Sequence, residues 1–119
     1  SDVKGKLAKH KDPFDALMSG FPAGTVTGAP KIRAMEIIKD LEPERRNIYS
    51  GAVGFFDFTG NVNTCIAIRT MIMKNGSVHF QSGAGIVYDS DPTKEFEETV
   101  SKAKAIMSAI DFAEDGLAA

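Results

Sequence analysis

Residues 83–99, GAGIVYDSDPTKEFEET, combine the end of a predicted strand, a tight turn and the start of a predicted helix. Glycine allows close approach to the backbone and tolerates positive φ, so Gly83-Ala84-Gly85 predicts a concave backbone site for an anion. Glu95 and Glu98 are three residues apart on the helix and therefore lie on one face. Clustered carboxylates are natural ligands of hard cations such as Mg²⁺. The stretch thus predicts an anion site followed by a metal-binding turn.

The rest of the chain alternates helical and strand patterns, and Asn75-Gly76 is a strong signal for a β-hairpin. An antiparallel three-strand meander between flanking helices predicts an α+β fold. We expect a short helix that begins at Asp12-Pro13, with Asp12 as N-cap, and is ended by Gly20 and Pro22. Further helices are expected at Pro30 to Glu42 and at about Pro92 to Phe112 with Asp91 as N-cap, and strands at Tyr49 to Phe58, Val62 to Lys74, and Ser77 to Ser82.

The predicted middle strand is apolar on both faces, which is typical of a central strand covered on both sides. Arg69 would then lie among apolar neighbours, and a buried guanidinium needs an anionic partner. That partner is either an internal carboxylate or a substrate carboxylate bound through two hydrogen bonds, and the sequence leaves both open. Cys65 belongs to the same apolar run and is expected to be a buried small hydrophobe.

Composition limits the class of protein. The chain has 119 residues, of which 43% are hydrophobic and 25% charged, so one soluble globular domain is expected. Its net charge of −2 gives no electrostatic footprint for nucleic acid. No apolar run approaches the roughly 18 residues of a membrane span, and no signal peptide is visible. A single cysteine excludes an internal disulfide framework. A cytoplasmic location is therefore expected.

Two features have alternative interpretations. The loop Ala23–Gly28 precedes the helix at Pro30, where free backbone N–H groups favour an anion. It lacks the spacing of a P-loop, and its other interpretation is a tight loop that fixes the entry to the helix. Glu98 and Lys102 are four residues apart, so they also fit an ordinary surface ion pair on a solvated helix face.

Three long motifs carry a resemblance to a known family: FPAGTVTGAPKIRAMEII at 21–38, YSGAVGFFDFTGNVNTCIAIRT at 49–70, and QSGAGIVYDSDPTKEFEET at 81–99. In this order they resemble the chorismate-utilising enzymes, and within them the C-terminal part of the large subunits (component I) of anthranilate synthases. The resemblance extends from Ser1 to about Ile110. It implies that residues 1–119 are the C-terminal portion of a larger chorismate-binding catalytic domain.

The resemblance also implies a reaction and a set of site residues. Chorismate would react with ammonia from a glutamine amidotransferase subunit (component II) and lose pyruvate, giving anthranilate for tryptophan biosynthesis, with Mg²⁺ as cofactor. By resemblance, the substrate-binding residues are Tyr49, Arg69, the backbone of Gly83, Ala84 and Gly85, and at the border Thr25 and Lys102. Glu98 would be a Mg²⁺ ligand, with Glu95 beside it.

The choice within the family rests on smaller signs. Ala84 within GAG and the GAVGFF run favour anthranilate synthases over the aminodeoxychorismate synthases of the folate pathway. Phe55 and Tyr88 depart from the residues that are common at those places. Because family members are several times longer, we expect the catalytic residues to lie upstream and the chain alone to be inactive. Open sheet edges also predict self-association, so a non-catalytic, self-associating α+β module remains an alternative.

Overall fold

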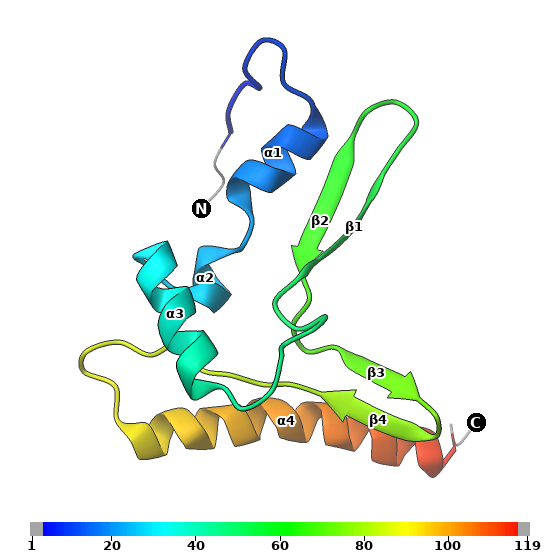
Figure 1. Cartoon of the computed structure of the whole chain (residues 1–119). Helices are drawn as coiled ribbons and strands as arrows, with labels where there is room; N and C mark the ends of the chain where they lie inside the picture. The colour runs from blue at the N-terminus through cyan, green and yellow to red at the C-terminus, as the bar shows by residue number, and fades with distance from the viewer. Residues whose placement is uncertain (1–3, 117–119) are drawn as a thin grey trace. The chain divides into compact units, whose positions relative to one another are not determined.

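The computed structural model describes residues 4–116, and these form two compact units. The first unit contains residues 4–41 and 50–66, and the second contains residues 42–49 and 67–116. The chain therefore passes from one unit to the other at 41–42, 49–50 and 66–67. Helices and antiparallel strand pairs confirm the predicted α+β class, as Figure 1 shows.

The first unit contains α1 (Pro13–Gly20), α2 (Gly24–Thr27), α3 (Lys31–Leu41), β1 (Ala52–Phe56) and β2 (Val62–Ile66). Asp12 is the N-cap of α1 as predicted, and the Asp15 N–H donates to its side chain at 2.9 Å. The Asp12 N–H donates to the Asp15 side chain at 3.2 Å, which completes a capping box that was not predicted from the sequence. The rings of Phe14 and Phe56, 6.2 Å apart, connect α1 with the β1–β2 hairpin. One helical turn, α2, lies where the sequence predicts a loop.

The second unit contains β3 (Met71–Lys74), β4 (Ser77–Phe80) and α4 (Pro92–Glu114). Asn75 and Gly76 have φ values of 53° and 75°, as the predicted hairpin turn requires. Asp91 caps α4 by accepting hydrogen bonds from two backbone N–H groups of the first turn. After β4, the Ser82 hydroxyl donates to the Thr99 carbonyl at 3.0 Å, which fixes the segment after the hairpin against α4.

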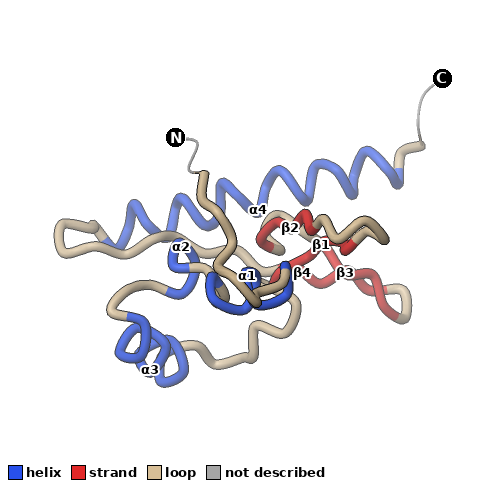
Figure 2. Tube along the Cα trace, turned by 90° about the horizontal axis from the view of Figure 1, so that it is seen from above, coloured by secondary structure: helices blue, strands red, loops and turns tan. Residues whose placement is uncertain are grey.

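The predicted middle strand is divided, and this is the main departure from the sequence prediction. Residues 67–70 belong to no strand, and β2 and β3 are in separate two-stranded sheets, β1–β2 and β3–β4. Figure 1 shows the connection from β2 to β3 as a loop, and Figure 2 colours the strands red and the loops tan. Arg69 has a φ of 52°, the left-handed conformation that a non-glycine residue adopts at a cost and that ends a strand ladder. Two hairpins therefore replace the three-strand meander.

Burial is sparse, so several burial predictions are wrong. Among residues 4–116 the buried hydrophobic side chains are Ala67 and Ile106. Cys65 is exposed because, within the described chain, β2 pairs with β1 alone and has no strand on its other side. Arg69 is exposed in the loop that follows β2. Apolar side chains of α4 are also open to solvent, among them Phe96, Val100 and Met107, with Phe96 67% exposed. An apolar surface of this kind marks an interaction site or an aggregation hazard, and self-association stays a prediction.

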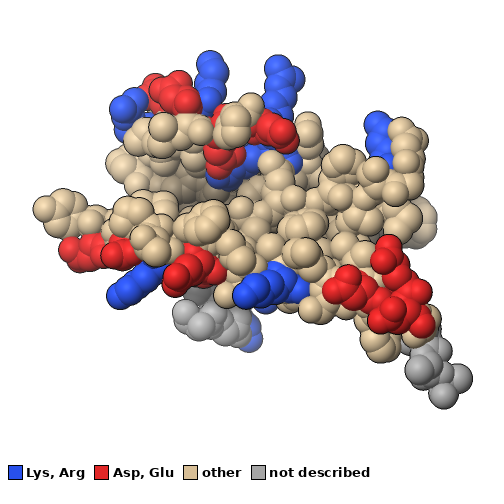
Figure 3. All heavy atoms as spheres, turned by 90° about the horizontal axis from the view of Figure 1, so that it is seen from below, with Lys and Arg blue, Asp and Glu red and all other residues tan. Residues whose placement is uncertain are grey.

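Charged side chains of both signs lie on the surface of the described chain. On the face that Figure 3 shows, acidic and basic side chains are largely interspersed, in keeping with the small net charge of −2. No helix within residues 4–116 is both long enough and apolar enough to cross a membrane.

The turn of the β1–β2 hairpin is organised by the carboxylate of Asp57. Its Oδ1 accepts from the Asn61 N–H at 2.8 Å and from the Thr59 N–H at 2.9 Å. Its Oδ2 accepts from the Asn61 side-chain amide at 2.7 Å. These hydrogen bonds favour the charged form of Asp57 and lower its pKa from 3.8 to about 2. The hydrogen bond from the Asn61 side chain makes the largest contribution.

Asn61→Ala is expected to raise the pKa of Asp57, because it removes the amide that contributes most to its lowering. The pKa of Asp57 is lower in the folded state, so its stabilisation is present above the unfolded pKa of 3.8 and lost as pH falls to about 2. An NMR titration of the Asp57 carboxyl group measures its pKa in the unchanged chain and in Asn61→Ala, with Asn47→Ala as the control. An Asp57 midpoint at its ordinary value in the unchanged chain would contradict this assignment.

Candidate functional site

Four of the predicted site residues are joined by contacts within the second unit. The ammonium of Lys102 donates to the Gly83 carbonyl at 2.9 Å and pairs with Glu98 Oε1 at 2.5 Å. The hydroxyl of Tyr49 lies against Gly83, since a Cβ built on that glycine would lie 2.9 Å from Tyr49 Oη. Three separate segments thus bring together a phenol, a backbone carbonyl, an ammonium and a carboxylate.

Local sequence explains why these groups meet. Glu98 and Lys102 are one helical turn apart on α4, so both side chains lie on one face and form the i,i+4 pair. The hydrogen bond between Ser82 and Thr99 holds the backbone before Gly83 along the same helix. The Lys102 side chain is 32% exposed and that of Glu98 is 52% exposed, so the ion pair is open to an incoming ligand.

The two glycines of the Gly83-Ala84-Gly85 segment have different surroundings. Neither Gly83 nor Gly85 has a positive φ, so the backbone here is not the left-handed turn that typically forms an anion nest. Gly83 is needed for the close approach of Tyr49, whereas no atom lies within 4 Å of a Cβ built on Gly85. Ala84 between them is half-buried. The backbone at Gly85 is therefore open to a ligand, whereas Gly83 is approached by Tyr49.

Glu95 and Glu98 are the candidate metal ligands on α4. Glu95 is half-buried in the first turn of the helix, and Glu98 is exposed and paired with Lys102. Two carboxylates separated by three residues fit part of an oxygen-ligand set for Mg²⁺, which usually retains several waters. Within residues 4–116 no group of three acidic, histidine or cysteine side chains is placed to hold a metal. Binding of Mg²⁺ by this pair stays a prediction.

Arg69 and Thr25 are not joined to this cluster by any hydrogen bond or ion pair within the described residues. Arg69 lies between β2 and β3 with an exposed side chain, so the guanidinium predicted to be buried is accessible to a ligand instead. Thr25 is exposed in α2, in the first unit. Their roles in substrate binding stay predictions.

Sequence reasoning missed an ion pair beside Tyr49. Arg46 donates from Nε to Glu42 Oε2 at 2.8 Å and from Nη2 to Glu42 Oε1 at 2.5 Å. The Arg46 Cζ lies 5.6 Å from the centre of the Tyr49 ring. The hydrogen bonds to Glu42 raise the pKa of the Arg46 guanidinium above its ordinary value. The spacing of Glu42, Arg46 and Tyr49, four and three residues apart, is the signal that would have revealed this group.

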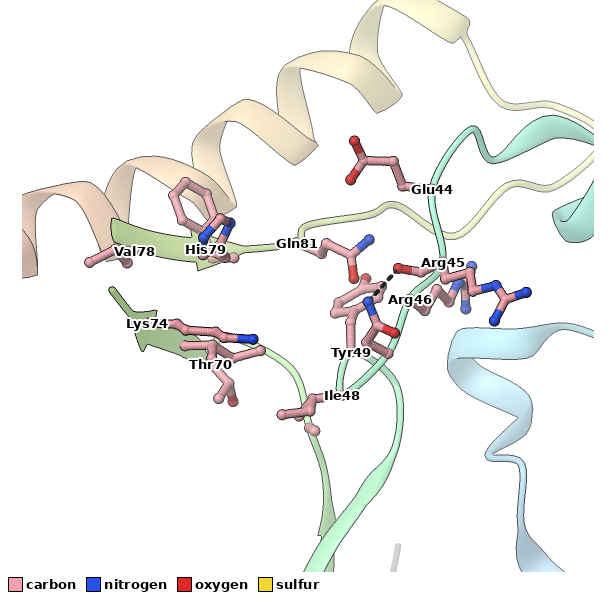
Figure 4. Close-up of a pocket in the computed structure, with 14 residues that line it drawn as sticks. Glu44, Arg45, Arg46, Ile48, Tyr49, Thr70, Lys74, Val78, His79 and Gln81 are labelled. Carbon is pink, nitrogen blue, oxygen red and sulfur yellow. Dashed lines mark hydrogen bonds between the residues drawn. The ribbon is translucent and has the colours of Figure 1, made fainter. Parts of the chain in front are cut away.

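A cavity of about 510 Å³ adjoins Tyr49 in the second unit, as Figure 4 shows. Arg45, Arg46, Lys74, His79 and Gln81 line it with several hydrogen-bond donors. A cavity with cationic side chains and one phenol ring suits a ligand that carries negative charge on an unsaturated or aromatic framework. Apart from Tyr49, these lining residues did not stand out in the sequence.

The family model described as "chorismate binding enzyme" matches residues 1–108. The chain belongs to the family of chorismate-binding enzymes. The resemblance predicted from the three motifs is thereby confirmed.

Curated relatives of this chain are named "Anthranilate synthase component 1". The protein from Aquifex aeolicus is 56% identical over 115 residues, covering 97% of this chain and 23% of the relative. The protein from Streptomyces coelicolor is 56% identical over 114 residues, covering 96% of this chain and 22% of the relative. The chain therefore spans less than a quarter of the length of these relatives.

Two solved structures share the fold of this chain. Anthranilate synthase component I from Streptococcus pneumoniae TIGR4 has a TM-score of 0.81 and 52% identity, covering 86% of this chain and 23% of that one. A putative 2,3-dihydroxybenzoate-specific isochorismate synthase, DhbC, from Bacillus anthracis has a TM-score of 0.79 and 27% identity, covering 84% of this chain and 27% of that one. The predicted fragment of a larger fold is confirmed.

Proposed function

We propose that the chain is the chorismate-holding part of an anthranilate synthase component I. The complete enzyme would convert chorismate and glutamine-derived ammonia to anthranilate and pyruvate in tryptophan biosynthesis. The observation that carries the proposal is the convergence of Tyr49, Gly83, Lys102 and Glu98 in a chain 56% identical to relatives of that name. The choice of anthranilate rather than aminodeoxychorismate as product follows these relatives and Ala84.

Each residue has a role set by its chemistry. Arg69 and Lys102 would bind the carboxylates of chorismate, the guanidinium through two hydrogen bonds and the ammonium as a point charge. The Tyr49 hydroxyl would orient the substrate near its enolpyruvyl group, and the backbone from Gly83 to Gly85 would line the opposite side. Thr25 is proposed at the border of the same site. Holding the substrate in one orientation is the contribution that these groups make to the reaction rate.

Glu95 and Glu98 would hold Mg²⁺ through carboxylate oxygens. When bound, the ion would stabilise negative charge on a substrate carboxylate and orient the ring. Lys102 pairs with Glu98 in the structure, so a cation at Glu98 must share that carboxylate with the ammonium or displace it. Like charges close together repel, and this competition favours a site that fills only when chorismate is present to neutralise both cations.

Two further parts of the proposal concern the complete protein. The name "component 1" of the relatives supports a second component, for which we propose the glutamine amidotransferase that supplies ammonia. A cytoplasmic location also stays a prediction. Because the catalytic constellation is expected to need more than these residues, the chain alone should give no anthranilate fluorescence with chorismate, Mg²⁺ and ammonium. Clear turnover by the pure chain would contradict that expectation.

Titration calorimetry with chorismate and Mg²⁺ tests the proposal on the chain itself. Weak binding is expected, and Arg69→Ala or Lys102→Met should each lower the affinity about tenfold or more, since each removes a charge-assisted contact worth about 1.5–3 kcal/mol. Lys104→Met on the same helix is the matched control, because Lys104 is exposed and outside the cluster. No detectable binding at millimolar chorismate, or equal loss in the control, would overturn the proposal.

The alternative of a non-catalytic, self-associating module is favoured by one observation, the exposed apolar side chains of α1, β1 and α4. Such a module would give oligomers in light scattering without any response to chorismate. Calorimetry and light scattering on the same sample therefore separate the two functions.

A further inference from the structure

We propose that Arg46, held by Glu42, is a positioning residue that fixes the ring of Tyr49 in the orientation that presents its hydroxyl at Gly83. This inference rests on the proposed function only in that Tyr49 is taken to contact chorismate. Neither Glu42 nor Arg46 is among the residues that the sequence motifs assign to the site. The Glu42–Tyr49 segment would thus orient one of the residues that form the candidate site.

The clamp between Glu42 and Arg46 is geometrically specific. Both carboxylate oxygens of Glu42 accept hydrogen bonds from two different nitrogens of the guanidinium, at 2.8 and 2.5 Å. A fork of two parallel hydrogen bonds fixes the plane of the guanidinium, which a single contact does not. The orientation of the Arg46 side chain is therefore fixed by Glu42, four residues earlier in the sequence.

The guanidinium lies over the Tyr49 ring, with 5.6 Å between Cζ and the ring centroid. That distance is within the range in which a cation is attracted to the face of an aromatic ring. The backbone assists this arrangement, because the Tyr49 N–H donates to the Arg46 carbonyl at 2.9 Å. One end of the ring is thus held by Arg46, while its hydroxyl lies against Gly83. Contacts at both ends leave the ring few orientations.

The Arg46–Glu42 pair is more enclosed than an ordinary surface pair. Its side chains are 21% and 37% exposed, whereas those of the exposed Arg33–Glu36 pair on α3 are 68% and 56% exposed. Exposed pairs contribute little because solvent screens them and their long side chains stay mobile. Partial enclosure beside an aromatic ring strengthens the interaction and makes the Arg46 side chain a better-defined surface for Tyr49.

The chain allows a direct optical test, because it contains two tyrosines and no tryptophan. Tyr88 is fully exposed, so Tyr88→Phe leaves Tyr49 as the sole tyrosine without disturbing packing. In that background, the near-UV circular dichroism band of tyrosine reports how firmly the Tyr49 ring is held. The variants to compare are Arg46→Met, which removes the cation, and Arg46→Lys, which keeps the charge and loses the planar fork.

We expect the band to fall by about half or more in Arg46→Met, and Arg46→Lys not to restore it, since lysine cannot form the forked, stacked arrangement. Arg33→Met is the matched control, because it removes an arginine from an exposed ion pair far from either tyrosine in sequence. Far-UV dichroism checks that each variant folds. If Arg46→Met loses its helical signal, Arg46→Lys alone decides the test.

Two results would overturn the inference: an unchanged tyrosine band in the folded Arg46 variants, or an equal fall of the band in Arg33→Met. The outcome is independent of chorismate. If the band falls as expected while the unchanged chain binds no chorismate, the positioning role stands and the proposed function fails. If chorismate binds, Arg46→Met should weaken that binding by about tenfold. Without Arg46 the Tyr49 ring would be mobile, and its loss of conformational freedom on binding would lower the affinity.

Discussion

Replacing Gly83 with alanine is expected to displace the side chain of Tyr49 and to destabilise the chain by about 1–3 kcal/mol, the usual cost of inserting a methyl group into an occupied space. The new Cβ would lie 2.9 Å from Tyr49 Oη, closer than a carbon and a hydroxyl oxygen can approach. The atom that must move belongs to the residue proposed to orient chorismate. Affinity for chorismate should therefore fall together with stability.

A double-mutant cycle identifies the cause of this effect. In a Tyr49→Phe background the hydroxyl is absent and the nearest ring carbon is 3.9 Å away, so Gly83→Ala should cost less than about 0.5 kcal/mol there. Gly85→Ala is the matched control, since nothing lies within 4 Å of its Cβ position. Urea denaturation provides the free energies of unfolding. Equal costs of Gly83→Ala in both backgrounds would show that the tyrosine hydroxyl is not the obstacle.

Gly54→Ala is expected to disrupt the β1–β2 hairpin, with a loss of about 2–4 kcal/mol in the free energy of unfolding, at the upper end for an overpacked site. A Cβ at this position would lie 2.1 Å from the Asn63 carbonyl oxygen and 2.8 Å from the Thr64 Cα. Both are backbone atoms of the paired strand, so no side-chain rotation relieves the clash. The strands must separate or shift in register.

The matched control for Gly54→Ala is Gly20→Ala, at the end of α1 in the same unit, where nothing lies within 4 Å. Alanine there should change the unfolding free energy by no more than about 0.5 kcal/mol. Amide hydrogen exchange locates the damage, since β1 and β2 amides should lose protection in Gly54→Ala alone. Equal urea midpoints for the two variants would contradict the strand geometry.

Local signals in the sequence predicted the element ends well. The caps at Asp12 and Asp91 and the turn at Asn75-Gly76 depend on a few neighbouring residues, and each is found as predicted. Helical spacing likewise predicted the Glu98–Lys102 ion pair, and the structure adds the hydrogen bond from Lys102 to Gly83. Short-range chemistry of this kind does not depend on what covers the element.

Longer-range features escaped the sequence for physical reasons. The run from Val62 to Lys74 has the side-chain alternation of one long strand. That alternation does not reveal that Arg69 adopts the left-handed backbone conformation and interrupts the strand. Burial of Cys65 was inferred from its apolar neighbours, but burial also requires a second layer over the strand. The stacking of Arg46 on Tyr49 depends on the backbone turn between them, which their spacing alone does not specify.

The repeated passage of the chain between its two units has a practical consequence for genetic dissection. A break in the gene at 66–67 would place Tyr49 on one polypeptide, and Gly83 and Lys102 on the other. Neither product would contain the whole cluster, yet each would retain the contacts within its own hairpin. Co-expressed halves would therefore behave as a split protein, and recovery of a chorismate response would report their complementation.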